Sequence, residues 1–129
     1  MENITDVVFP KQKVQFVNLT PHEVVIFHED GKTVKLVIKP SGQVARAVSR
    51  RKKVGEVNGI PVYKNEFLDI EGLPKPKRET VYIVSSLVQQ VLKIRGIKRK
   101  DVISPDTSPE GVVRDKEGNI VGTKGFQII

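Results

Sequence analysis

ETVYIVSSLVQQVLKIRGIKRKDVISPDT, residues 79–107, combines a strand, a helix and a polar turn in one stretch, and it decides the fold. The residues at 81–84 are β-branched or aromatic, which is typical of a buried strand. The next apolar residues recur at helical spacing and predict a helix of about ten residues, whose apolar stripe is Leu87, Val88, Val91 and Leu92. The opposite face is predicted to carry Gln89, Gln90 and Lys93.

Both ends of this helix carry the residue types that helix ends favour. Ser85 or Ser86 is predicted as the N-cap, because a serine oxygen accepts a hydrogen bond from the free amides of the first turn. Gly96 is predicted to end the helix, with basic residues in the last turn. A helix of this length is marginal alone in water, so it must pack against a sheet.

The composition predicts a mainly β protein. Valine and isoleucine number 33, against 6 leucines. The 129 residues have the length of a single domain, 1–129, in which residues 1–13 are predicted as a flexible arm or an irregular edge strand. The predicted class is α+β, mainly antiparallel: a single bent sheet or a small open barrel with one helix packed on it.

Turn residues between β-branched runs predict three hairpins, which pair 23–28 with 33–38, 54–57 with 60–63, and 112–114 with 120–121. Asn58-Gly59, in the second, is the strongest hairpin signal in the chain. Val34, Leu36 and Ile38 alternate with Lys35 and Val37, which predicts that one face of the strand at 34–38 is buried. Residues 43–49 are predicted as a separate strand, which ends before the charge run 50–53.

Charge and hydropathy narrow the function classes. Lys and Arg number 22 against 15 Asp and Glu, and the net charge of +7 favours polyanionic partners. No stretch approaches 18 apolar residues and the N-terminus does not read as a signal peptide, so a cytoplasmic protein without a membrane partner is predicted. With no cysteine and two histidines, neither a metal nor a cofactor is expected. The abundance of Lys and Glu suits a hot habitat, and the oligomeric state is left open.

Four motifs in combination resemble those of a family of small proteins from bacterial, phage and viral genomes, for which no function is established. They are NLTPH at 18–22, PSGxxAR at 40–46, YIVSSLV at 82–88, and DVISPDT with VVRDKEGNIVG within 101–122. The resemblance spans nearly the whole chain after residue 14. It implies a set of shared polar positions: Asn18, Thr20, His22, Ser41, Arg46, Ser85, Asp101, Asp106, Thr107, Arg114 and Asp115. Where similar proteins often carry a basic residue after the serine, this chain has Ser86.

A site for a small anion is the favoured functional hypothesis. Arg46 lies inside the apolar run VARAV and Arg114 ends the short strand VVR, and the guanidinium fork suits a carboxylate or phosphate. The start of the helix offers the free amides and the hydroxyls of Ser85 and Ser86. His22, in a turn, completes the predicted site. The sequence therefore predicts a non-catalytic binder of a small anion such as a nucleotide derivative.

Structural roles compete with this interpretation. The serines can simply cap the helix, and each arginine can pair with a carboxylate inside the protein. Asp101, Asp106 and Asp115 could gather around a metal or act in acid–base chemistry, but their positions favour turns.

Two other functions remain open. Basic clusters at 46–53, 75–78 and 93–100 could bind nucleic acid, through Arg50, Arg51, Lys52, Lys53, Lys98, Arg99 and Lys100. An enzyme acting on a nucleotide or phosphate substrate is the third hypothesis. The chain contains no serine-hydrolase, zinc-protease, P-loop or dinucleotide-binding motif, which favours a role without catalysis.

Overall fold

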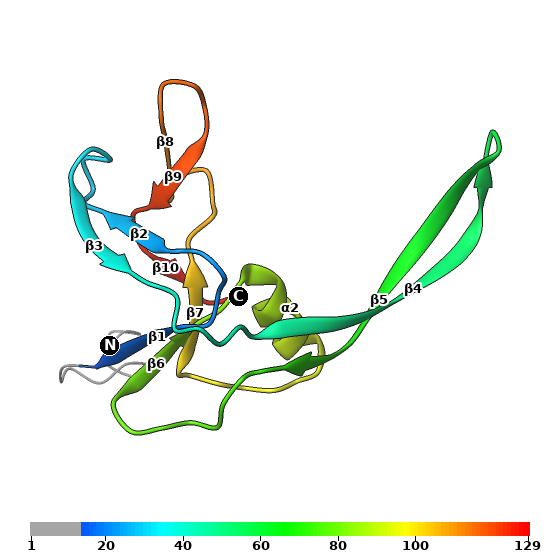
Figure 1. The fold of residues 1–129 in the computed structure, drawn as a ribbon, viewed down its shortest axis with the longest axis horizontal. Helices are drawn as coiled ribbons and strands as arrows, with labels where there is room; N and C mark the ends of the chain where they lie inside the picture. The colour runs from blue at the N-terminus through cyan, green and yellow to red at the C-terminus, as the bar shows by residue number, and fades with distance from the viewer. Residues whose placement is uncertain (1–13) are drawn as a thin grey trace, which may run out of the picture.

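The computed structural model describes residues 14–129, which form ten strands and one helix (Figure 1). The elements in chain order are β1 (Gln15–Asn18), β2 (Val24–Phe27), β3 (Val34–Ile38), β4 (Arg46–Val57), β5 (Ile60–Glu71), β6 (Thr80–Ile83), α2 (Ser86–Ile94), β7 (Val102–Pro105), β8 (Val112–Arg114), β9 (Ile120–Thr123) and β10 (Phe126–Gln127). The prediction for residues 1–13 lies outside the described residues. The prediction of a mostly β protein with one helix is confirmed for the part described.

The strands form three open sheets, so the prediction of a single bent sheet or small barrel is wrong. Two sheets have four strands each, in the orders β1-β6-β7-β10 and β3-β2-β9-β8, and β4 and β5 form the third alone. The pairs β1–β6, β6–β7 and β2–β9 are parallel, so the two larger sheets are mixed. The other four strand pairs within residues 14–129 are antiparallel, so antiparallel pairing predominates as predicted. The parallel β6–β7 pair follows from α2, which returns the chain to the same end of the sheet.

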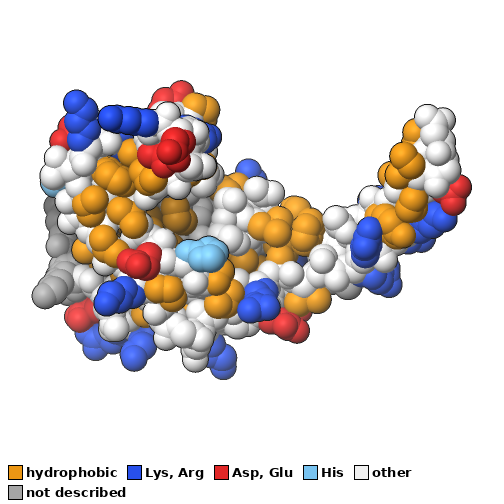
Figure 2. Space-filling model, turned by 45° about the horizontal axis from the view of Figure 1, so that its top comes forward, with side chains coloured by type: hydrophobic (Ala, Val, Ile, Leu, Met, Phe, Trp, Pro, Cys, Tyr) orange, Lys and Arg blue, Asp and Glu red, His pale blue; other side chains and the backbone are white. Residues whose placement is uncertain are grey.

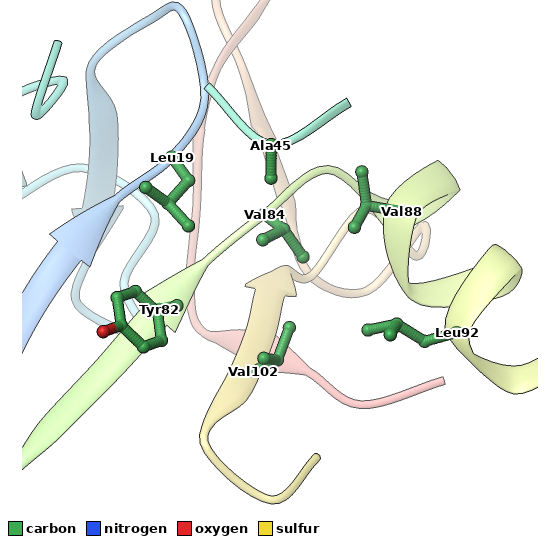
Figure 3. Packing of buried hydrophobic residues seen from close by; sticks show 7 residues of the cluster. All are labelled: Leu19, Ala45, Tyr82, Val84, Val88, Leu92 and Val102. Atoms are coloured by element: carbon green, nitrogen blue, oxygen red, sulfur yellow. The ribbon is translucent and has the colours of Figure 1, made fainter. Parts of the chain in front are cut away.

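The first core cluster joins α2 to the sheet of β6 and β7. Its members are Leu19, Ala45, Tyr82, Val84, Val88, Leu92 and Val102. Figure 3 shows Val88 and Leu92 directed from the helix toward Val84 and Val102. The predicted apolar stripe is therefore confirmed, except that Leu87 is exposed.

The second core cluster lies on the other face of the same sheet. It contains Val24, Ile26, Val81, Ile83 and Ile103. Successive residues of β6 serve opposite clusters, which explains why the run at 81–84 is continuously apolar rather than alternating. The C-terminal strand packs here through Phe126, whose ring lies 5.5 Å from that of Phe16.

The helix ends where the sequence predicts. Ser85 is the N-cap and its Oγ accepts a hydrogen bond from the Val88 amide at 3.3 Å. Gly96 adopts a φ of 70° just after the helix, where a residue with a side chain would be strained.

Two predictions about burial are wrong. β3 is an edge strand whose Val34, Leu36 and Val37 are all exposed, so its alternation does not create a buried face. Gln89, predicted on the outer face of α2, is only 4% exposed. Its long amide reaches β7, where Nε2 donates to the Val102 carbonyl at 3.0 Å and Oε1 accepts from the Ser104 hydroxyl at 2.7 Å.

Ser104→Ala is expected to lower the free energy of unfolding by about 1–3 kcal/mol, because it leaves the buried Oε1 of Gln89 without its donor. Urea unfolding monitored by circular dichroism measures the change. Ser49→Ala, at an exposed strand position, is the control and should change stability little. Equal stability of the two variants would mean that the Gln89–Ser104 bond adds nothing.

Along residues 14–129, no helix combines the length and the hydropathy that a membrane span requires.

Candidate functional site

The antiparallel pair of β4 and β5 projects from the rest of the molecule, and we call its residues, 46–71, the hairpin arm (Figure 1). Each strand has 12 residues, which at about 3.3 Å per residue makes the arm roughly 36 Å long. Every residue from Ser49 to Asn65 is exposed, so both faces of this outer part meet solvent. Only the base contributes to the body, where Ile70 packs against the first core cluster.

The turn at the end of the arm is the hairpin predicted from Asn58-Gly59. Asn58 has φ 50° and Gly59 has φ 77°, as a type I′ turn requires. The hairpin is longer than predicted, because the charge run 50–53 continues β4 instead of interrupting it. Register shifts lie between Val48 and Ser49 and between Lys53 and Gly55, and such bulges increase the twist of a ribbon.

One face of the outer arm carries an uncompensated pair of like charges. Lys52 stands directly opposite Lys64 in the register, and directly opposed side chains have Cβ atoms only about 5 Å apart. Within residues 14–129 neither lysine makes a hydrogen bond or an ion pair. On the same face, Arg50 Nη2 lies 3.1 Å from Glu66 Oε2. Opposed like charges destabilise a sheet, so this pair costs stability unless an anion lies over it.

The other face holds an arginine stacked on a tyrosine. The guanidinium carbon of Arg51 lies 3.6 Å from the centroid of the Tyr63 ring, which is the geometry of a cation–π contact. Nearby, Lys53 Nζ lies 2.8 Å from Glu56 Oε1. The stack fixes the guanidinium beside the arm without using its donors in an ion pair.

The tip of the arm is apolar. Val57 faces Ile60 across the turn, and Val54 and Val62 follow below them. All four are exposed, and Ile60 is the most exposed of them at 67%. Figure 2 shows hydrophobic side chains near the tip of the arm and Lys and Arg side chains along it. The arm therefore presents a basic stem and an apolar end, both without a covering layer.

The structure does not bring the predicted anion-site residues together. Arg46 begins β4, whereas Arg114 ends β8, in another sheet and in a separate part of the molecule (Figure 1). Both are exposed, and Arg114 Nη1 donates to the Gly118 carbonyl of its own hairpin at 2.7 Å. The expected pocket between these two arginines is therefore not formed.

The other members of that predicted site have local roles. Ser85 caps α2 and Ser86 is its first residue. His22 is exposed in the loop between β1 and β2, where its backbone carbonyl accepts hydrogen bonds from Asn18 Nδ2 at 2.9 Å and Thr20 Oγ1 at 3.0 Å. This part of the NLTPH motif builds a turn.

The predicted carboxylates also serve turns and an ion pair. Asp106 accepts from the Ser108 amide, and Asp115 accepts from the amides of Glu117 and Asn119. Asp101 receives two hydrogen bonds of 2.8 Å from one guanidinium. In the described part of the chain, no three His, Asp or Glu side chains gather in a group that could hold a metal ion.

The basic clusters fall in different places. Arg50 to Lys53 lie on the hairpin arm, residues 75–78 lie in the loop before β6, and Lys98 to Lys100 follow α2. Arg99 is a structural residue, because it pairs with Asp101 and donates to the Pro74 carbonyl at 2.9 Å. The hydrogen bond to Asp101 raises the pKa of the Arg99 guanidinium. The candidate nucleic-acid residues therefore lie on separate elements and do not form one continuous basic surface.

The sequence analysis predicted Val57, Ile60 and Tyr63 in a hairpin, but neither these residues nor Lys64 were assigned to a binding site. The Asn58-Gly59 turn was the available signal, because a two-residue turn sets the register of the strands on both sides of it. Extending the hairpin register outward from that turn would have placed Lys64 opposite Lys53, and the bulge between Lys53 and Gly55 shifts the pairing to Lys52.

Comparison of the chain with models of protein families, with curated proteins and with solved structures found no match.

Proposed function

We propose that this protein is a non-catalytic binder of double-stranded nucleic acid, and that the hairpin arm enters a groove of the duplex. The observation that carries the proposal is the exposed Lys52–Lys64 pair, in which two cations are held side by side without a partner in residues 14–129. Phosphate groups of a duplex would remove the repulsion between them and release condensed counterions.

The shape of the arm supports this function. Neighbouring strands lie about 4.8 Å apart, and the major groove of DNA, about 12 Å wide, admits a two-stranded ribbon. The outer arm is bare on both faces, so no part of the body prevents it from entering a groove. The excess of basic over acidic residues in the whole chain would favour the encounter.

The apolar tip and the stacked arginine suit contacts with base edges. Val57 and Ile60 could meet thymine methyl groups, and Arg51 keeps guanidinium donors for guanine or phosphate oxygens. A duplex is favoured over a single strand, because Tyr63 is the aromatic residue of the outer arm and Arg51 covers one face of its ring.

The small-anion site predicted from the sequence has weaker support, because its residues Arg46, Arg114 and Ser85 lie on separate elements. An enzymatic role has no supporting cluster of acid, base and nucleophile in residues 14–129.

Replacing Lys52 and Lys64 together by alanine tests the proposal. We expect the double variant to bind a 20-base-pair duplex about tenfold more weakly than the unmodified protein, and to lose about two from the slope of binding against salt. Fluorescence anisotropy of a labelled duplex measures both quantities.

The matched control is Lys32→Ala with Lys116→Ala, which removes two exposed lysines from the turns after β2 and β8. It lowers the net charge by the same amount and should leave most of the affinity. If both double variants lose affinity equally, binding reflects overall charge and the arm has no special part in it.

A further inference from the structure

A concave feature lies at the end of α2, away from the outer arm. Its volume is about 380 Å³, within the range of small-molecule sites. It is a half-open hollow between the last turns of α2, the loop that follows, β7 and the C-terminal residues. Its apolar lining is formed by Leu92, Ile97, Val102, Ile128 and Ile129.

The way in which α2 ends builds one wall of this cavity. The amide of Ile97 donates to the Leu92 carbonyl at 2.9 Å, and that of Gly96 donates to the Lys93 carbonyl at 3.1 Å. These two bonds form a Schellman motif, which places Ile97 beside Leu92. Because the backbone itself satisfies these carbonyls, the nearby lysines are not required to cap the helix.

The rim of the cavity is basic. Lys93, Lys98 and Lys100 line it, and among the described residues no Asp or Glu side chain does. In the part of the chain that the structure describes, none of these lysines makes an ion pair or a hydrogen bond. Arg99 also lines the cavity, but Asp101 neutralises it. An apolar floor under three unpaired cations matches a molecule with an apolar body and an anionic head.

We propose that this cavity binds a soluble amphiphilic anion, an aliphatic chain that ends in a carboxylate. The chain would lie on Leu92, Ile97 and Ile128, and the head would meet Lys98 and Lys100. A nucleotide fits less well, because none of the residues from 14 to 129 that line the cavity is aromatic, and a base would have no ring among them to stack on. This cavity lies apart from the outer arm, so it would bind the anion whether or not the arm binds nucleic acid.

Titration of ¹⁵N-labelled protein with decanoate, below its micelle concentration, tests the site by nuclear magnetic resonance. We expect saturable shifts of the amides from 92 to 102 and at 128–129. Decanol, which lacks the charge, and acetate, which lacks the chain, should bind at least about fivefold more weakly. Decyltrimethylammonium, with the same chain and the opposite charge, should not shift these amides.

Lys98→Ala with Lys100→Ala should weaken decanoate binding by about five- to tenfold, because two exposed ion pairs are lost. Lys75→Ala with Lys77→Ala, in the exposed loop before β6, is the matched control and should bind normally. The spectra of both variants report directly on whether the fold is kept.

Three outcomes would overturn the proposal. The first is equal binding of the cationic amphiphile, and the second is unchanged affinity in the Lys98/Lys100 variant. The third is a set of shifts centred on the apolar hollow around Phe16 and Phe126 instead of the end of α2.

Discussion

The Val88→Asp variant is expected to lose cooperative folding. Val88 is 1% exposed, and it belongs to the cluster in which α2 meets Leu19, Val84 and Val102. An aspartate there would bury a carboxylate without a partner, in addition to the loss of apolar contacts. Such a change costs several kcal/mol, which is most of the stability of an ordinary domain of about 5–15 kcal/mol.

Thermal unfolding followed by circular dichroism measures this effect. Ile94→Asp is the matched control, because it introduces the same charge on the same helix at a position that is 77% exposed. The control should keep a sharp transition within a few degrees of that of the unmodified protein. A change of about 1 kcal/mol in the free energy of unfolding shifts the melting temperature by about 2–8 °C. A soluble Val88→Asp protein with an unchanged transition would show that the apolar stripe of α2 is not buried.

Shortening the hairpin arm is expected to abolish duplex binding and to leave the body folded. In this variant Asn-Gly replaces residues 52–64, so that Arg51 and Asn65 flank a new two-residue turn. The deleted residues are all exposed and none belongs to either core cluster. The melting temperature should therefore change by a few degrees at most, while the anisotropy signal of a labelled duplex stays at its background value.

A second variant separates the charge of the arm from its apolar tip. Val57→Ser with Ile60→Ser keeps both lysines and the full length, so salt-dependent binding should persist with a modest loss of affinity. If the shortened protein binds the duplex as well as the full-length one, the site lies on the body. If the serine variant alone loses all binding, the tip rather than the lysine pair carries the affinity.

The sequence predicted those elements whose signals are local. The α2 stripe, its Ser85 cap and its Gly96 end depend on neighbouring residues, and the structure has all three. The Asn58-Gly59 turn is equally local, since only residues that tolerate positive φ can occupy both of its positions.

The arrangement of strands into sheets could not be predicted in the same way. Parallel pairing of β1 with β6 joins residues 65 positions apart, such as Gln15 and Thr80, and no local pattern encodes it. Gln89 illustrates a similar limit, because its burial depends on the Ser104 hydroxyl across the helix–sheet interface. Tertiary contacts overrode the simple polar face expected for the helix.

The candidate site was only partly predictable. The charge run at 50–53 was recognised, but its pairing with Lys64 needed the register of the whole hairpin. The anion site around Arg46 and Arg114 required two strands to meet, and the chain places them in different sheets. The local roles of Ser85 and Gly96 could be predicted from the sequence, whereas the distances between segments could not.

The salt dependence of duplex binding by the unmodified protein reports how many phosphates the hairpin arm neutralises. Each phosphate that a lysine or arginine neutralises contributes about −0.9 to the slope of log K against log salt concentration. Lys52, Lys64 and Arg51 together predict a slope of about −2 to −3 between 50 and 200 mM salt. A slope near zero, or no duplex binding even at the lowest salt, would show that the hairpin arm does not bind duplex phosphates.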